Sequence, residues 1–448
     1  MLRALLDWFK TGPDRPPVSA DPAVIRRAYE KKRWGVFLSL TLGYSVFYVV
    51  RLNLAVAKKP MLDEGVFSAS ELGYIGSAML GVYAVGRLFN GFLCDRANIR
   101  RFMAAALLLS GLTNLALGAT TWFVAFALLW GLNGWFQTVG AAPSGASLRQ
   151  WFPPSVYGTR YGVWSSSHGI GSAVTYVATS ALVAWLGWRW GFWGPGLFAA
   201  AAALVLFRTL ADRPEACGLP NVHDLEGVPR PASLDAASVG RLQLQVLRDS
   251  AIWRIGLAAA AMYVARYGVN SWGALYLQEA KRYSLVAAGT WLGIYTTATV
   301  VGAVASGWLS DRLFGARRDV PSLICGVVEV GALVAFYLIP AGHEWLDAVA
   351  LSVFGFALGA LLAYLGGLWA VDLSPPRAAG AAMGIIGFFS YVGASIQDAV
   401  SGVLIDGTKQ MVAGVATYDF RPAFVFWIAT SVVSIVLVLS VWNAKPRE

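Results

Sequence analysis

Apolar runs of about 20 residues recur along this 448-residue chain, and no other feature of the sequence limits its fold so strongly. A helix needs about 20 apolar residues to cross the hydrocarbon core of a bilayer, because each residue advances it by about 1.5 Å. Hydrophobic residues make up 57% of the chain and charged residues only 13%. A soluble domain usually carries about 25% charged residues. The sequence therefore predicts an all-α membrane protein.

Twelve such runs are predicted to span the membrane, six on each side of one hydrophilic stretch. That stretch, 211–250, holds four prolines and many charges, which favour an irregular linker. The predicted order is an N-terminal segment able to form an interfacial helix, a six-helix bundle, the linker, a second bundle and a tail, at 1–34, 35–210, 211–250, 251–443 and 444–448. The spans lie near 35–57, 71–94, 102–119, 121–146, 158–185, 190–209, 252–278, 284–309, 320–340, 345–371, 378–405 and 421–442.

The placement of Lys and Arg predicts the orientation in the membrane. Of the 35 basic residues, 25 lie on the side of the termini and the linker, seven lie on the opposite side, and three lie inside spans. Cytoplasmic loops carry an excess of Lys and Arg. We therefore expect both termini in the cytoplasm, with the bacterial inner membrane as the location. The same asymmetry explains the net charge of +10 without nucleic acid as a partner.

A short loop motif occurs twice. The chain reads Gly91-Phe-Leu-Cys-Asp95-Arg96 after the second predicted span and Gly307-Trp-Leu-Ser-Asp311-Arg312 after the eighth, with the aspartates 216 positions apart. This Gly-x-Leu-x-Asp-Arg pattern resembles a loop motif that is typical of the major facilitator superfamily, whose two six-helix halves are parallel repeats. We assign Asp95, Arg96, Asp311 and Arg312 to a gating or structural role. The alternative is a charge cluster that only fixes topology.

A second repeat places one arginine inside the first span of each half. Tyr48-Val-Val-Arg51 is echoed by Tyr263-Val-Ala-Arg266, 215 positions later. An arginine at such a depth costs about 2.5–3.5 kcal/mol, so it should face a cavity or a partner. Two symmetric cations without nearby acids predict a dianion site, because a guanidinium can hold a phosphate group with two parallel hydrogen bonds. The alternative for each arginine is a structural role at helix carbonyls.

Five more polar residues inside predicted spans are candidates for substrate binding. Tyr48 and Tyr263 each precede a repeated arginine by three positions, so their hydroxyls can donate to a phosphate oxygen, and the alternative is a packing or interfacial role. His168 follows three serines and can change charge near neutral pH. Arg87 lies about two turns from a predicted cytoplasmic end, so it can line a path or extend to the membrane surface. Asp398 is an acid placed well inside a span, where it can accept from a substrate hydroxyl or pair with a basic residue.

Catalytic groupings are not found in the sequence. It has no phosphate-cradling loop, no zinc-ligand spacing and no nucleophile elbow, and its three cysteines lie far apart. We therefore expect a protein that is not an enzyme and that needs neither a metal nor a cofactor.

The arginine contexts resemble one family. Gly43-Tyr-Ser-Val-Phe-Tyr48-Val-Val-Arg51 and Tyr263-Val-Ala-Arg266-Tyr-Gly-Val-Asn-Ser-Trp are similar to segments of the organophosphate:phosphate antiporters. The resemblance implies that Arg51, Arg266 and His168 bind phosphate and that Tyr263 lies in the pocket. It also implies exchange of a sugar phosphate, with hexose phosphate favoured, for inorganic phosphate by alternating access.

The chain departs from this family at two positions. Leu52 stands where members often carry a lysine, and Asp398 where several carry an apolar or basic residue. These changes leave the organic substrate open, together with two alternatives: a membrane sensor of hexose phosphate, and a proton-coupled carrier of glycerol-3-phosphate or another organic anion. The expected partners are a phosphorylated anion, inorganic phosphate and the lipid bilayer. The symmetric core needs no second chain, so we expect a monomer.

Overall fold

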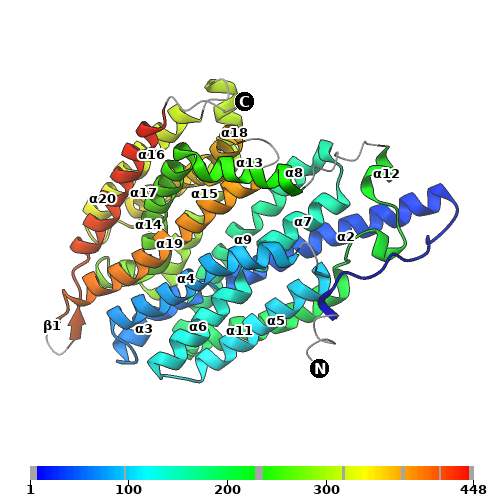
Figure 1. Cartoon of the computed structure of the whole chain (residues 1–448). Coiled ribbons are helices and arrows are strands. Elements are labelled where there is room, and N and C mark those ends of the chain that lie inside the picture. Colours follow the sequence, from blue (N-terminus) through cyan, green and yellow to red (C-terminus); the bar gives the residue numbers. More distant parts are fainter. Residues whose placement is uncertain are drawn as a thin grey trace.

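The computed structural model describes residues 8–94, 97–227, 236–314, 318–374, 379–412 and 415–442, and within them it is a bundle of long helices (Figure 1). Nine helical stretches of the described residues are long and apolar enough to cross a membrane. α4 (Ala69–Cys94), α6 with α7 (Phe123–Gln137 and Ala141–Trp151) and α14 (Ser250–Glu279) complete the expected set of twelve. The all-α membrane architecture predicted from the sequence is confirmed.

The N-terminal half comprises the helices from α2 to α11. α2 begins with Pro22 in its first turn, where the Asp21 side chain accepts from the Ala23 amide and caps the helix. Besides α4, α6 and α7, the elements of this half are α2 (Pro22–Val49), α3 (Asn53–Asp63), α5 (Ile99–Gly118), α8 (Pro154–Ser165), α9 (Ser167–Val174), the π-helical turn η1 (Thr175–Thr179), α10 (Ser180–Leu186) and α11 (Trp190–Thr209).

The C-terminal half begins at α14, which the Asp249 side chain caps by accepting from the Ala251 amide. A small antiparallel hairpin precedes its last helix. The further elements are α15 (Leu285–Leu313), α16 (Asp319–Leu338), α17 (Glu344–Ala363), the π-helical turn η3 (Tyr364–Leu368), α18 (Trp369–Leu373), α19 (Ala379–Asp406), β1 (Gln410–Val412), β2 (Val415–Thr417) and α20 (Arg421–Ser440).

The bundle has two distinguishable ends (Figure 1). We call the end with β1 and the tip of α3 the hairpin end, and the end with α12 (Val222–Glu226) the linker end. The two halves meet closely where α4 crosses α19. An added Cβ at Gly73 would lie 2.9 Å from the Gly402 Cα atom, so these glycines allow the two backbones to touch.

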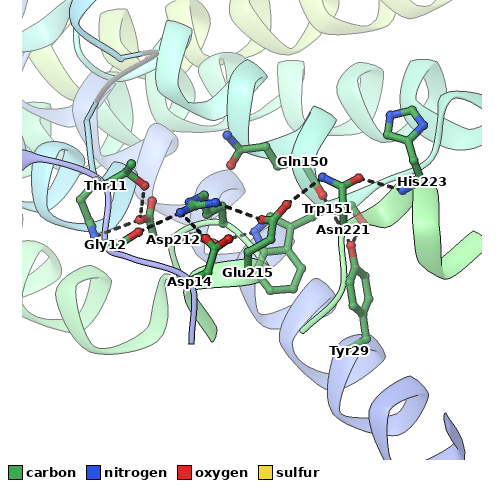
Figure 2. Close-up of polar contacts among 12 residues, drawn as sticks. Thr11, Gly12, Asp14, Tyr29, Gln150, Trp151, Asp212, Glu215, Asn221 and His223 are labelled. Atoms are coloured by element: carbon green, nitrogen blue, oxygen red, sulfur yellow. Dashed lines mark hydrogen bonds and ion pairs between the residues drawn. The ribbon is translucent and has the colours of Figure 1, made fainter. Parts of the chain in front are cut away.

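The stretch after α11 is docked onto the N-terminal half rather than irregular. The Asp212 carboxylate accepts from Thr11 Oγ1 at 2.9 Å, and the Asp212 backbone carbonyl accepts from Trp151 Nε1 at 2.9 Å (Figure 2). The carboxylate also accepts from Asn98 Nδ2 at 3.0 Å. Arg213 pairs with Asp14 at 2.5 Å. In its described residues, 211–227 and 236–250, the predicted linker contains η2 (Glu215–Cys217), α12 and α13 (Ala236–Arg248).

The repeated loop motif is only partly visible. Asp95 and Arg96 lie outside the described residues, as do residues 1–7 at the start of the predicted N-terminal segment. Asp311 lies on α15, and the exposed Arg312 in its last turn has its Cζ atom 5.6 Å from the Trp308 ring centroid. The gating role of this motif therefore stays a prediction.

Candidate functional site

The first helix of the chain is interrupted beside Arg51. α2 ends at Val49 and α3 begins at Asn53, which frees the Val50 carbonyl from the helical hydrogen-bond pattern. That carbonyl accepts from Asn133 Nδ2 at 2.8 Å and from Asn114 Nδ2 at 3.3 Å. A broken helix at membrane depth is tolerated where its freed backbone groups find partners and where it lines a cavity. The break thus places Arg51 on a fixed but non-helical stretch.

Arg51 is buried among aromatic rings. Its side chain donates from Nη2 to the Tyr267 hydroxyl at 2.9 Å, and this bond joins the two halves. The Cζ atom lies 4.2 Å from the ring centroid of Tyr83, and 5.2 and 5.3 Å from those of Tyr48 and Tyr391. The electron-rich ring faces stabilise the cation without neutralising it. The Nε atom has no hydrogen-bond partner among the described residues, so this donor of the guanidinium group is available.

Arg266 lies on the other side of Tyr267. It sits on the continuous helix α14, and its Cζ atom is 4.9 Å from the ring centroid of Tyr263 and 5.5 Å from that of Tyr267. No hydrogen bond or ion pair holds Arg266 within the described part of the chain. Tyr267 therefore contacts both repeated arginines, with its hydroxyl on Arg51 and its ring on Arg266. The structure brings the two arginines together as the repeat predicted.

Two small cavities adjoin these arginines. One is lined by Arg51 and Asp398, the other by Arg266 and His168, and Tyr267 borders both. Each cavity is lined by residues of both halves, and each contains one of the two guanidiniums.

His168 is placed beside this second cavity by α9. Its Nδ1 atom contacts the Ser165 carbonyl oxygen, and a carbonyl can only accept, so Nδ1 carries the proton. Nε2 is then available to a substrate. The Tyr48 ring lies 5.8 Å from the imidazole, centroid to centroid, and lines the same cavity.

Arg87 reaches across to the C-terminal half. Its Cζ atom is 5.7 Å from the Tyr391 ring centroid, and a Cβ at Gly387 would lie 2.8 Å from that atom. The Tyr391 ring also packs against Tyr83 at 4.3 Å between centroids. Arg87 thus approaches the aromatic cluster around Arg51 instead of extending away from it.

Asp398 pairs with a residue that lies just beyond the predicted span 35–57. Lys58 lies within α3, fully buried, and its Nζ atom is 3.2 Å from Asp398 Oδ1. Ser271 donates to the same carboxylate oxygen at 2.8 Å and accepts from Lys58 at 2.9 Å. The Lys58 Nζ atom is also 3.4 Å from the Trp272 ring centroid. The charge of Asp398 is therefore matched by that of Lys58.

The remaining charge of the site is positive. Arg51, Arg87 and Arg266 pair with no carboxylate among the described residues, and Asp398, the acid that lines the Arg51 cavity, is matched by Lys58. Three guanidiniums beside tyrosine hydroxyls can hold an anion that carries several acceptor oxygens.

Sequence reasoning missed several members of the cluster. Lys58 lies one residue beyond the predicted span 35–57, so the signal for its burial was weak. Tyr83, Tyr267 and Tyr391 gave a weaker one, because an intramembrane tyrosine is common in packing and at interfaces.

Comparison with known proteins decides the family. A model described as Major Facilitator Superfamily matches residues 40–397. The chain belongs to the major facilitator superfamily. A crystal structure of another protein, a bacterial homolog to the human lysosomal transporter Spinster in an inward-facing and unoccupied conformation, has the same fold. It aligns with a TM-score of 0.72 at 16% identity, over 91% of this chain and 95% of that one.

Two relatives within the major facilitator superfamily extend over nearly the full length. The probable hexose phosphate transport protein of Chlamydia pneumoniae is 30% identical over 443 residues, 96% of this chain and 95% of the relative. The membrane sensor protein UhpC of Escherichia coli (strain K12) is 30% identical over 449 residues, 98% of this chain and 99% of the relative. The predicted family is confirmed, and this superfamily member is a multi-pass integral membrane protein.

Proposed function

We propose that this member of the superfamily exchanges a sugar phosphate, with hexose phosphate favoured, for inorganic phosphate. The observation that carries the proposal is the pair of repeated arginines, Arg51 and Arg266, buried on either side of Tyr267 without a carboxylate partner in the described residues. The relative named as a hexose phosphate transport protein supports the choice of substrate.

The residues take distinct roles in this proposal. Arg51 and Arg266 bind the phosphate oxygens, one from each half, and Arg87 adds positive charge to the cavity. His168 accepts at Nε2 from a protonated phosphate oxygen, or donates there when it is itself protonated. Tyr48 and Tyr263 shape the pocket beside the two arginines.

Repulsion between the two arginines couples substrate binding to movement of the halves. Two guanidiniums about 10 Å apart repel by roughly 1.7 kcal/mol at an effective dielectric constant of 20. Closing a dry cavity around an empty pair adds the cost of removing water from both charges. A bound phosphate offsets both terms, so the loaded carrier changes its facing state more easily than the empty one. Exchange rather than net flux is the expected result.

The orientation completes the proposal. The basic residues favour the linker end in the cytoplasm, together with both termini. The hairpin end then faces the opposite side of the membrane. The carrier acts as a monomer, because both arginines come from one chain.

The test is uptake of radiolabelled phosphate into proteoliposomes that hold unlabelled phosphate, compared with empty proteoliposomes. We expect uptake only in the loaded vesicles, with competition by external glucose-6-phosphate. Equal uptake driven by a pH gradient into empty vesicles would instead support a proton-coupled carrier.

A second candidate is a sensor of hexose phosphate, because the relative UhpC is named as a membrane sensor. A sensor would bind glucose-6-phosphate without useful flux. Binding to the purified protein with no exchange in loaded vesicles would favour it.

A further inference from the structure

We infer that Lys58 and Asp398, here called the closing pair, hold the hairpin end shut and separate whenever that end opens. This inference rests on the alternating access proposed above, and it assigns to Lys58 a role in the conformational step of transport. The two residues come from different halves, since Lys58 lies on α3 and Asp398 on α19. Any movement that parts the halves at this end must therefore break the pair.

The closing pair is fully enclosed in the present conformation. The Lys58 side chain is 0% exposed and that of Asp398 is 3% exposed, with 3.2 Å between Nζ and Oδ1. Ser271 hydrogen-bonds to both charged groups, and the Trp272 ring faces the ammonium group. Both charges have thus exchanged water for fixed partners from three helices.

Glycines seal the bundle at the level of the closing pair. A Cβ at Gly76 would collide with the Asp398 carboxylate, and a Cβ at Gly73 would lie 2.6 Å from the Asp398 carbonyl oxygen. Close approach of α4 and α19 therefore excludes water from Asp398. The two charges are therefore enclosed only while the two halves are in contact.

Further bonds toward the hairpin end join the same two halves. Lys59 pairs with Glu279 at 2.6 Å, and Ser70 donates to Asp406 at 2.7 Å. The side chains of Lys59 and Asp406 are only partly buried, so water and salt weaken these bonds more than they weaken the closing pair. The closing pair lies between this rim and the Arg51 cavity, which Asp398 also lines.

Single and double substitutions of the closing pair should have different effects on the equilibrium between the closed and open states. Removing one member leaves the other as an unpaired charge in the closed state, which is strongly unfavourable, whereas in the open state the remaining charge is hydrated. Each single variant should therefore shift the population toward the state that is open at the hairpin end. Removing both charges abolishes the penalty, so the double variant should close again.

The experiment measures the distance between the halves at the hairpin end by double electron–electron resonance in nanodiscs. Spin labels are attached to cysteines at Thr121→Cys and Gln410→Cys, exposed positions in the α5–α6 connection and in β1. The three native cysteines, Cys94, Cys217 and Cys325, are replaced by serine. The parent, Lys58→Met, Asp398→Asn and the double variant are compared at pH 7.5 without substrate.

We expect one short-distance population in the parent, and a longer-distance population enriched at least about tenfold in each single variant. The double variant should return to the short distance. Single variants with the parent's distance distribution, or a double variant that stays shifted, would overturn the inference.

The matched control is Lys281→Met. Lys281 and Asp347 also form a buried Lys–Asp pair, with 3.0 Å between Nζ and Oδ1, but both belong to the C-terminal half. This variant carries the same kind of unpaired acid, so it reports the general cost in folding, and its distance distribution should match the parent. The distance measurement needs no phosphate, so it tests the closing pair even if the proposed phosphate exchange fails. Likewise, the exchange assay tests the proposed function even if the closing pair has no role.

Discussion

Exchange of phosphate by the Arg51→Lys variant should be about 100-fold slower than exchange by the unaltered protein, although the positive charge is kept. A hydrogen bond to a charged group contributes about 1.5–3 kcal/mol, and lysine cannot present the two parallel donors of a guanidinium. The change also removes the planar group that lies 4.2 Å from the Tyr83 ring centroid. The measurement is initial-rate uptake of labelled phosphate into phosphate-loaded proteoliposomes, normalised to inserted protein.

Arg189→Lys is the control for this substitution. Arg189 precedes α11 in a connection between helices, and its Cζ atom also lies over an aromatic ring, 4.4 Å from the Trp188 ring centroid. It is remote in sequence and element from the cluster, so exchange should be unchanged. If Arg51→Lys retained most of the exchange rate, two-donor binding at Arg51 would be wrong, and a point charge would suffice.

Gly402→Val should abolish exchange while leaving phosphate binding in place. In the closed state a Cβ at Gly402 would lie 2.6 Å from the Ala69 carbonyl oxygen and 2.8 Å from the Gly73 Cα atom, both of which belong to backbone. Backbone atoms cannot rotate away, so α4 and α19 must stay apart at the hairpin end. The carrier then keeps one facing state and cannot complete the exchange cycle.

Gly331→Val provides the matched comparison. Gly331 lies in α16, and a Cβ there would meet nothing within 4 Å, so valine should fit without shifting another helix. Equilibrium binding of phosphate by calorimetry and exchange in loaded vesicles are measured for both variants. Normal exchange by Gly402→Val would show that the tight crossing of α4 and α19 is not needed for transport.

The sequence predicts the parts of this site that a repeat reveals. Arg51 and Arg266 occupy corresponding positions, so the expectation that they meet between the halves needed only the internal symmetry. The helix break beside Arg51 could not be predicted in the same way. No proline or glycine lies at 50–52, and the partners of the freed carbonyl, Asn114 and Asn133, come from distant helices.

The pairing of Lys58 with Asp398 could not be predicted from the sequence either. Lys58 follows an apolar run and precedes Lys59 and Pro60, a pattern typical of a loop at the end of a span. The structure extends the helix to Asp63 and buries Lys58, because a distant acid, Asp398, is available to it. Pairs that are 340 positions apart depend on tertiary packing, which hydropathy does not report.

The docked stretch after α11 gives the chain a native chemical reporter. Cys217 is a free, half-buried thiol in η2, two residues after Glu215. Burial raises the pKa of the Cys217 thiol, which lowers the fraction of reactive thiolate at neutral pH. Alkylation of this cysteine should therefore be slow while the stretch stays docked and faster once it detaches, so the rate of thiol modification follows the state of the linker without any engineered label.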